Sequence, residues 1–270
     1  MNSTRPSDRN AFLAELSPAD YDLFRPHLTG FTLTIGERLQ DFGTAVEQVV
    51  FPHGGLVALT IPLRSGHGGG AILAGRDSFV GAFDAAATVP AMCGAEVYIG
   101  GRAARISASA FRSIFDQSPA IRRVTTRYMA ALMMQSHQTA LCNAAHPVER
   151  RISRWLLEIL DRSGGFDVPL TQSTLAQMIG VQRTTVNLAA GRLEAEGVIN
   201  CGRGHIQIVR REQLEQRACE CYRNVRSYVS RLHELPTVPV ATPTEPSDRK
   251  AVSSVGQEPS RGSNPLRLGP

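Results

Sequence analysis

The most informative segment of the sequence is LTQSTLAQMIGVQRTTVNLAAGRLEAEG, residues 170–197, in which two helical patterns are separated by only Gly180-Val181-Gln182. Thr171 is a suitable N-cap for the first helix, because its hydroxyl can accept a hydrogen bond from a free backbone N–H. The first helix has an apolar face of Leu175, Met178 and Ile179, and the second has one of Val186, Ala189, Ala190 and Leu193. Gly180 allows a sharp turn, since glycine adopts left-handed backbone angles without steric strain. Two short helices joined in this way predict a helix-turn-helix, whose second helix enters the major groove of DNA.

A small hairpin is predicted directly after the second helix. Residues 198–209, VINCGRGHIQIV, form two short strand patterns around the turn Cys201-Gly202-Arg203-Gly204. Such a hairpin is typical of the wing of a winged helix domain. In this position, Arg203 and His205 could contact the phosphates of DNA.

A long helix is predicted between Ser118 and Pro147, because Ser118-Pro119 has the form of a helix start and no proline or glycine follows before Pro147. A helix of about 28 residues spans about 42 Å, which is more than a small β-domain can cover. One apolar stripe contains Val124, Tyr128, Ala131 and Leu132, and Met129, Met133 and Ala140 extend it around the helix. We expect one side to pack on the preceding domain and the other on a second copy, so residues 118–146 are predicted to be a dimerisation helix. A long helix buried within a monomer is the alternative.

The residues before this helix have the patterns of short β-strands. Residues 31–36 and 95–106, FTLTIG and AEVYIGGRAARI, alternate, whereas LVALTIPL and AILAG, at 56–63 and 71–75, are apolar runs. Strands at this spacing predict an antiparallel β-barrel or jelly roll. The expected fold class is therefore α+β.

The predicted domains follow from these patterns. The β-domain is expected over residues 12–117, and the winged helix-turn-helix domain over residues 147–222, where an amphipathic helix pattern comes first. Ser17-Pro18-Ala19-Asp20 predicts a capped helix start near the N-terminus. Residues 236–270 hold seven of the sixteen prolines and few large apolar residues, which predicts a disordered tail.

The span from about Ser17 to Tyr222 resembles the Crp/Fnr family of bacterial transcription regulators. The β-domain, the long helix and, most specifically, LTQSTLAQMIGVQRTTV at residues 170–186 carry the resemblance. It implies a cyclic-nucleotide-binding-like β-domain that senses a signal, and a homodimer that binds a palindromic operator in double-stranded DNA. It also implies contact with RNA polymerase and, more often than repression, activation of transcription.

The resemblance places Arg183 at the position of the family's base-reading arginine, where a bidentate contact to guanine O6 and N7 gives roughly 1–3 kcal/mol of discrimination. The other expected DNA contacts are Gln182, Thr185, Asn187, Thr171, Gln172, Arg203 and His205. For Gln182 and Asn187, a solvated helix face is the alternative. The best-known members carry a Glu directly after the arginine and a second Arg further along, where this chain has Thr184 and Leu188. Its preferred DNA site is therefore expected to differ from theirs.

The family's cyclic-nucleotide pocket uses a glycine-rich turn, a Glu for the ribose hydroxyl and an Arg-Ser pair for the cyclic phosphate. Gly81 matches the glycine, but Ala82 stands in place of the Glu and Met92-Cys93 in place of the Arg-Ser pair. A phosphate buried without a cationic partner loses its charge-assisted hydrogen bonds, so tight binding of cyclic AMP is disfavoured. Arg76 completes the set of candidate effector-pocket residues, and the effector itself is not identified.

No metal site or cofactor is predicted from the cysteines and histidines. An N-terminal iron–sulfur cluster is disfavoured, because the first cysteine of the chain is Cys93. Cys142 and His146 lie four residues apart on the long helix, and Cys219-Glu220-Cys221 forms a separate pair. Two ligands are too few for a structural metal site, and buried cysteine commonly acts as a small apolar residue.

Composition sets wider limits on the function. The formal charge of +5 and the pI near 9.2 permit a nucleic-acid partner. No apolar run approaches the roughly 18 residues of a membrane span, the N-terminus lacks a signal-peptide pattern, and the odd number of cysteines does not fit a secreted disulfide framework, so a cytoplasmic protein with no membrane partner is expected. No arrangement of nucleophile and base indicates an enzyme. The alternative function is a ligand- or metal-sensing module whose winged domain contacts other proteins.

Overall fold

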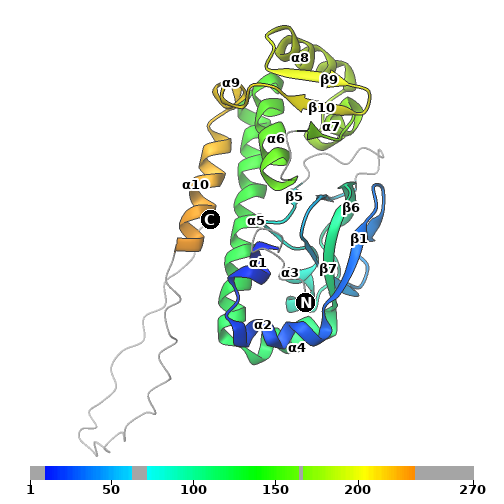
Figure 1. The fold of residues 1–270 in the computed structure, drawn as a ribbon, viewed down its shortest axis with the longest axis vertical. Helices are drawn as coiled ribbons and strands as arrows, with labels where there is room; N and C mark the ends of the chain where they lie inside the picture. The colour runs from blue at the N-terminus through cyan, green and yellow to red at the C-terminus, as the bar shows by residue number, and fades with distance from the viewer. Residues whose placement is uncertain (1–9, 63–71, 164–166, 235–270) are drawn as a thin grey trace, which may run out of the picture. The chain divides into compact units, whose positions relative to one another are not determined.

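The structure is a computed structural model of the 270-residue chain, and it describes residues 10–62, 72–163 and 167–234. The described residues all belong to one compact unit, whose helices and strands are shown in Figure 1. The predicted disordered tail, residues 236–270, lies outside the described residues.

Two short helices begin the described chain. Helix α1 comprises Ala11–Glu15 and α2 comprises Pro18–Phe24, which is followed by a 3-10 turn over Arg25–His27. The Ser17 hydroxyl accepts a 3.1 Å hydrogen bond from the backbone N–H of Asp20. The predicted capped helix start is therefore confirmed.

The β-domain consists of two antiparallel sheets, with strand orders β1-β7-β3 and β2-β6-β4-β5. The strands are β1 (Thr29–Leu33), β2 (Arg38–Gln40), β3 (Gln48–Pro52), β4 (Leu56–Thr60), β5 (Ile72–Ala74), β6 (Gly94–Ile99) and β7 (Gly101–Ser107). Both sheets contribute to one buried apolar cluster, which includes Leu33, Val50, Val57, Ala74, Val97 and Ala103. The expected jelly roll is confirmed, although the sheets do not join into a closed barrel within the described part of the chain.

Helix α5 is the long helix that the sequence predicts. It comprises Pro119–Ala145 and follows α3 (Ala82–Ala87) and α4 (Ala108–Gln117). Helix α5 packs against α1, α4 and the β-domain through an aromatic cluster. The cluster consists of Phe12, Phe24, Phe51, Phe79, Phe111 and Tyr128. Tyr128, in the predicted apolar stripe, is 2% exposed and packs in this cluster, whereas Met133 is 57% exposed.

The winged domain follows α5 with little intervening chain. Its elements are α6 (Val148–Ser163), β8 (Asp167–Val168), α7 (Gln172–Ile179), α8 (Arg183–Ala195), β9 (Ile199–Gly202), β10 (His205–Ile208) and α9 (Arg211–Arg217). The three strands form one small sheet of order β8-β10-β9. Trp155 of α6 is almost fully buried in a core that also takes in Leu56 and Leu73 of the β-domain. The β-domain and the winged domain therefore share one apolar cluster.

Helix α10, Cys221–Glu234, is an element that the sequence patterns do not predict, and it lies alongside α5 (Figure 1). The His233 ring packs against Tyr128 of α5 at 5.0 Å, and its Nδ1 lies 3.0 Å from a carboxylate oxygen of Glu15. At the other end of the helix, the Tyr222 hydroxyl donates a 2.8 Å hydrogen bond to Asp161 of α6. Through these contacts α10, which follows the winged domain in the sequence, packs back against the long helix α5.

Of the helices that the structure describes, none combines the length and the apolar character that crossing a membrane requires.

Candidate nucleic-acid interface

Gly180 forms the turn between α7 and α8. Its φ of +72° lies in the left-handed region, where a side chain would be strained. The N–H groups of Gly180 and Val181 both donate to the carbonyl of Ala176, at 2.9 and 3.1 Å, so the end of α7 is closed by backbone hydrogen bonds. The three-residue turn predicted from the sequence is confirmed.

Helix α8 has one buried and one exposed side. The predicted core residues Val186, Ala189, Ala190 and Leu193 are each at most 3% exposed. The exposed residues of its first two turns are Gln182, Arg183, Thr184, Thr185, Asn187 and Leu188. Thr184 and Leu188 are four residues apart and lie on the stripe opposite the buried side. Leu188 is 62% exposed, although it is a large apolar residue.

Helix α6 holds α7 and α8 in position. Arg151 is buried, and its guanidinium donates a 2.5 Å hydrogen bond to the carbonyl of Ile179, the last residue of α7. Arg192 of α8 forms an ion pair with Glu149 of α6. Trp155 packs into the core that α6, α7 and α8 share. These contacts fix the angle between the two helices, so the exposed side chains of α8 are presented as one rigid surface.

The wing is the hairpin of β9 and β10, which pair in antiparallel register with Gly202 opposite His205. Gly204 closes the turn with a φ of +81°. The His205 ring lies directly over Gly202 and leaves no room there for a Cβ atom. Arg203 and His205 are both exposed. The hairpin is confirmed, and contact of these two side chains with DNA remains a prediction.

The N-terminus of α7 carries the remaining expected DNA contacts. The Thr171 hydroxyl accepts a 3.0 Å hydrogen bond from the N–H of Thr174, which is the predicted N-cap. Gln172 is half-buried. Burial raises the pKa of Cys201 in β9, and the Gln172 side chain opposes that shift, so Gln172 lies beside the wing. Contacts of Thr171 and Gln172 with DNA remain predictions.

Four of the five candidate effector-pocket residues lie close together in the β-domain. Gly81, with a φ of +77°, precedes α3, and Ala82 at the start of that helix is fully buried. Gln40 lies between Gly81 and Cys93, because its amide donates a 2.8 Å hydrogen bond to the Cys93 carbonyl and its oxygen would lie 3.1 Å from a Cβ on Gly81. Met92 belongs to the same region.

Asp84 contacts this region, whereas the fifth candidate, Arg76, lies elsewhere. The Met92 N–H donates a 3.4 Å hydrogen bond to Asp84, and burial raises the pKa of Asp84 although hydrogen bonds from Met92 and Gln40 oppose the shift. Arg76 is exposed and lines a cavity of about 910 Å³ together with residues of α1, α5, α6 and α10. Arg76 therefore lies with a different group of residues.

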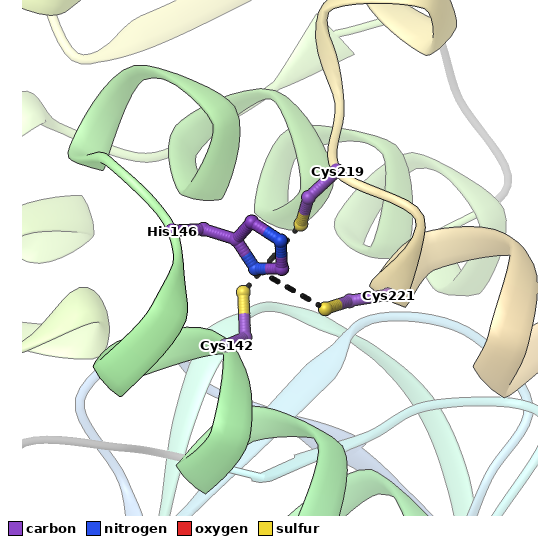
Figure 2. Close-up of side chains that lie close together, drawn as sticks. All are labelled: Cys142, His146, Cys219 and Cys221. Atoms are coloured by element: carbon purple, nitrogen blue, oxygen red, sulfur yellow. Dashed lines mark hydrogen bonds between the residues drawn. The ribbon is translucent and has the colours of Figure 1, made fainter.

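The two cysteine and histidine pairs, which are far apart in the sequence, form a single group in the structure (Figure 2). Cys142 lies in the last turn of α5 and His146 directly follows that helix, whereas Cys219 and Cys221 lie where the chain passes from α9 into α10. The three sulfur atoms and a ring nitrogen of His146 all lie within 4.8 Å of one another. The prediction of no metal site treated each pair by itself, and the pairs meet because α10 runs back along α5.

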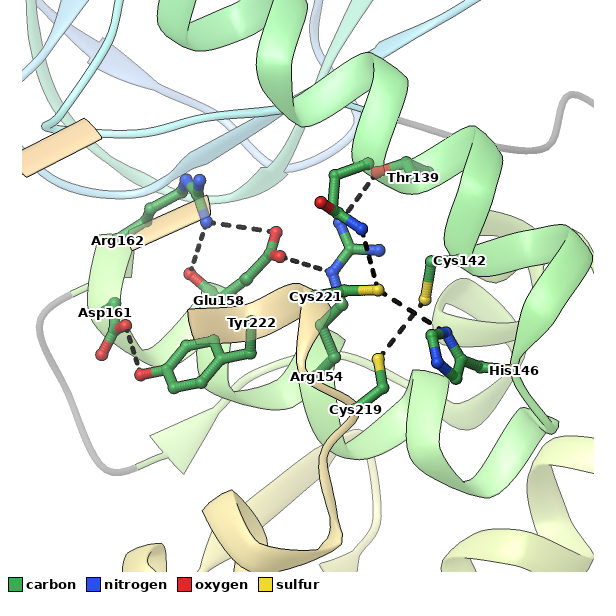
Figure 3. Close-up of polar contacts among 11 residues, drawn as sticks. Thr139, Cys142, His146, Arg154, Glu158, Asp161, Arg162, Cys219, Cys221 and Tyr222 are labelled. Carbon is green, nitrogen blue, oxygen red and sulfur yellow. Dashed lines mark hydrogen bonds and ion pairs between the residues drawn. The ribbon is translucent and has the colours of Figure 1, made fainter. Parts of the chain in front are cut away.

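Arg154 of α6 lies beside this group and connects it to Glu158 of the same helix (Figure 3). Arg154 is fully buried, and it donates hydrogen bonds to Glu158 at 2.7 Å and to the Thr139 hydroxyl at 2.8 Å. A hydrogen bond with Cys219 and the neighbouring Arg154 lower the pKa of Cys142, although burial opposes the shift. The same contact with Cys142, together with burial, raises the pKa of Cys219. One thiol of this pair therefore loses its proton more readily than the other.

Comparison with known proteins identifies the winged domain and the fold. Residues 150–217 match the Crp-like helix-turn-helix domain. No curated protein sequence matches the chain. Among solved structures, the chain is similar to the c-di-GMP responsive global regulator CLP of Xanthomonas campestris, with a TM-score of 0.59 and 15% identity over 71% of this chain and 99% of that chain. It is similar to FixK2 from Bradyrhizobium japonicum, with a TM-score of 0.57 and 16% identity over 71% of this chain and 98% of that chain. It is also similar to a CRP/FNR-family transcriptional regulator from Thermus thermophilus, with a TM-score of 0.58 and 20% identity over 70% of this chain and 98% of that chain.

The fixed turn, the exposed second helix and the wing define a class of domain, the winged helix-turn-helix. Within this class, the domain match is to the Crp-like type, and the solved structures of similar fold include Crp/Fnr-family regulators. The winged domain is Crp-like, and the jelly roll and the long α5 before it complete the Crp/Fnr fold. The resemblance stated from the sequence is confirmed.

Proposed function

We propose that the protein is a homodimeric regulator that recognises a palindromic DNA site with α8, under the control of a signal at its N-terminal domain. The observation that carries this proposal is the exposed first turn of α8, with Arg183 as its first residue, on a helix that a Crp-like core holds rigid. Recognition helices of this kind place their N-terminal side chains at base edges in the major groove. Titration of a labelled operator duplex with the purified protein, against an unrelated duplex as competitor, tests the proposal.

The other exposed polar residues are assigned to the same interface. Gln182, Thr185 and Asn187 would reach base edges or phosphates beside Arg183, since all are exposed on α8. The wing residues Arg203 and His205, and Thr171 and Gln172 at the N-terminus of α7, would contact phosphates, which position the protein on the duplex. Contact with RNA polymerase and activation of transcription are proposed from the resemblance alone. The alternative role in protein contacts is not favoured, because the domain match is to a DNA-binding fold.

Leu188 is proposed to contact a thymine methyl group in the major groove, because a large apolar side chain is 62% exposed on the outer stripe of the recognition helix. Replacing that thymine by uracil, which lacks the methyl group, is expected to weaken binding by about 1 kcal/mol per half-site, roughly fivefold. Leu188→Ala should bind the thymine and uracil duplexes equally. Leu23→Ala on α2, where the side chain is 36% exposed, serves as the control. If the wild-type protein shows no preference for thymine at any position of the site, Leu188 does not have this role.

The exposed face of α5 is proposed to form the dimer interface. Met133 and Leu141 lie eight residues apart on one stripe of the helix and are 57% and 59% exposed, as expected for side chains that a second copy covers. Leu141→Glu is expected to convert the dimer into monomers, because the symmetry of the dimer brings two unpaired carboxylates into an apolar contact. Light scattering measures the molar mass in solution. Ile35→Glu, at a β-domain residue that is 63% exposed, should leave the dimer intact, and an unchanged mass for Leu141→Glu would contradict the proposed interface.

The signal at the N-terminal domain is proposed not to be cyclic AMP bound in the manner of the family. Ala82, at the position of the ribose-binding Glu, is fully buried in the aromatic cluster, and Met92, at the position of the phosphate-binding Arg, is 50% exposed. Neither residue supplies a polar anchor for the nucleotide. An N-terminal iron–sulfur cluster remains disfavoured, because no cysteine of the chain comes before Cys93.

A further inference from the structure

We propose that Cys142, His146, Cys219 and Cys221 bind one Zn²⁺ ion at the junction of α5 and the winged domain. The residues form a Cys3His set, which is one of the common ligand sets of structural zinc sites. Each pair comes from a short, ordered piece of chain. Cys142 lies in the last turn of α5, and His146, which directly follows the helix, donates its backbone N–H to the Cys142 carbonyl at 3.1 Å. Cys219 and Cys221 frame a single residue.

The distances between the ligand atoms fit a single tetrahedral ion. With Zn–S of about 2.3 Å and Zn–N of about 2.05 Å, the ligand atoms of a tetrahedral site lie about 3.5–3.8 Å apart. The Sγ atoms of Cys142 and Cys219 are 3.5 Å apart, and the Sγ of Cys221 is 3.5 Å from Nδ1 of His146. All four ligand atoms lie within 4.8 Å of one another, so small side-chain movements complete the tetrahedron. An iron–sulfur cluster would hold its ligands further apart, because they bind different irons.

The outer contacts of His146 are those of a metal ligand. Its Nδ1 points toward the cysteines (Figure 2). Its Nε2 lies 3.2 Å from a carboxylate oxygen of Glu220. Histidines that bind metals commonly donate their other N–H to a carboxylate, which fixes the tautomer and the orientation of the ring. Glu220 lies between the two cysteines of the second pair, so one three-residue segment supplies two ligands and this carboxylate.

The surroundings suit a site with net negative charge. Three thiolates and one divalent ion carry a net charge of about −1. The fully buried Arg154 lies beside Cys142, and its Nη1 is buried without a hydrogen-bond partner among the described residues (Figure 3). The Gln138 amide lies 3.0 Å from the sulfur of Cys221 and can donate to its thiolate. The cysteines are buried, and the His146 side chain is 13% exposed, so an ion would enter from the side of His146.

The ion would join the two ends of the winged domain. One ligand pair lies just before α6, the first helix of this domain, and the other just after α9, so residues 147–218 separate them. A metal that closes so long a loop removes conformational freedom from the unfolded chain and stabilises the folded one. It would also fix the winged domain to α5, the helix on which the proposed dimer is built.

Metal content of the full chain tests the site. After purification under reducing conditions and incubation with Zn²⁺ followed by removal of free metal, the protein is expected to hold one Zn²⁺ per chain. Cobalt in place of zinc should give the strong visible absorption of a tetrahedral cobalt thiolate. Cys142→Ser and Cys219→Ser should both abolish stoichiometric binding. Cys93→Ser and Cys201→Ser remove the two cysteines outside the group and are expected to retain one ion per chain.

Two further variants separate loss of ligands from loss of folding. His146→Cys keeps four ligands and should still bind one ion, with a cobalt spectrum changed by the fourth thiolate. Glu220→Gln should keep the stoichiometry and weaken the affinity for Zn²⁺ about 10–100-fold, because it removes only the carboxylate that orients His146. Reduced wild-type protein that takes up no Zn²⁺, or variants of Cys142 and Cys219 that bind as well as the wild type, would overturn the proposal. Recovery of a Cys142–Cys219 disulfide with no metal uptake after its reduction would do the same.

The effect on DNA rests on the proposed function and is measured separately. Removal of Zn²⁺ by a chelator is expected to lower the melting temperature and to weaken binding of the operator duplex, with both restored by added Zn²⁺. One bound ion without any DNA binding would support the site and contradict the proposed function. Full DNA affinity of a chain that takes up no ion would overturn the site and leave the proposed function in place.

Discussion

Arg183→Ala is expected to weaken binding to the operator by about 2–6 kcal/mol, which is roughly 30-fold or more in Kd. A bidentate contact from arginine to guanine provides roughly 1–3 kcal/mol of discrimination, and a dimer makes this contact once in each half-site. The side chain is exposed at the first residue of α8, so its removal leaves the core of the winged domain intact. Fluorescence anisotropy measures Kd on the operator and on duplexes that carry each of the other base pairs at the contacted position.

The variant should also lose its preference at that position, since the contact reads the identity of the base. Arg25→Ala is the matched control, because it removes the same charge from a side chain that is 70% exposed on the β-domain. It is expected to bind the operator like the wild type. Unchanged affinity and unchanged base preference in Arg183→Ala would remove this residue from the recognition surface.

A steep loss of DNA affinity with salt is the second large effect that we expect. Each phosphate that a protein neutralises releases counterions, so a protein with about 6–10 phosphate contacts loses roughly 10³–10⁵ in affinity between about 50 and 200 mM salt. Arginines of α8 and of the wing are exposed, and in the proposed dimer both copies are expected to supply such contacts. The slope of log K against log salt concentration, measured on the operator, gives the number of contacts.

A wing variant measures how much of the salt dependence comes from the wing. Arg203→Ala is expected to reduce its magnitude by about 2, one contact from each copy, and to weaken binding to operator and unrelated duplexes by a similar factor. Its side chain is exposed in the turn between β9 and β10, so the hairpin itself should be unaffected. Affinity that does not change with salt would contradict an interface with duplex DNA.

Local patterns predict most of the fold. The turn at Gly180, the core residues of α8 and the uninterrupted helix before Pro147 depend on backbone preference and apolar spacing, which neighbouring residues determine. The jelly roll follows from short strands separated by turn residues. The closure of the barrel could not be predicted, because it depends on which strand edges pair, and that is a property of the whole domain.

The contacts that could not be predicted join segments far apart in the chain. The cysteines at 219 and 221 meet Cys142 only because α10 lies along α5, and no local pattern fixes where a helix packs. The spacing of the two pairs, at the two ends of one domain, is the sequence signal that points to the group. The neighbours of Arg76 could not be predicted for the same reason, since they come from α1, α5, α6 and α10.

Selection of bound duplexes from a random DNA pool, with the full chain purified and loaded with Zn²⁺, tests the proposed recognition of DNA most directly. A parallel selection with cyclic AMP shows whether that nucleotide changes the result. We expect enrichment of a two-fold symmetric site, with half-sites about 34 Å apart along the duplex, in both selections. Sequences that remain as diverse as the starting pool in both selections would contradict recognition of a palindromic operator by α8.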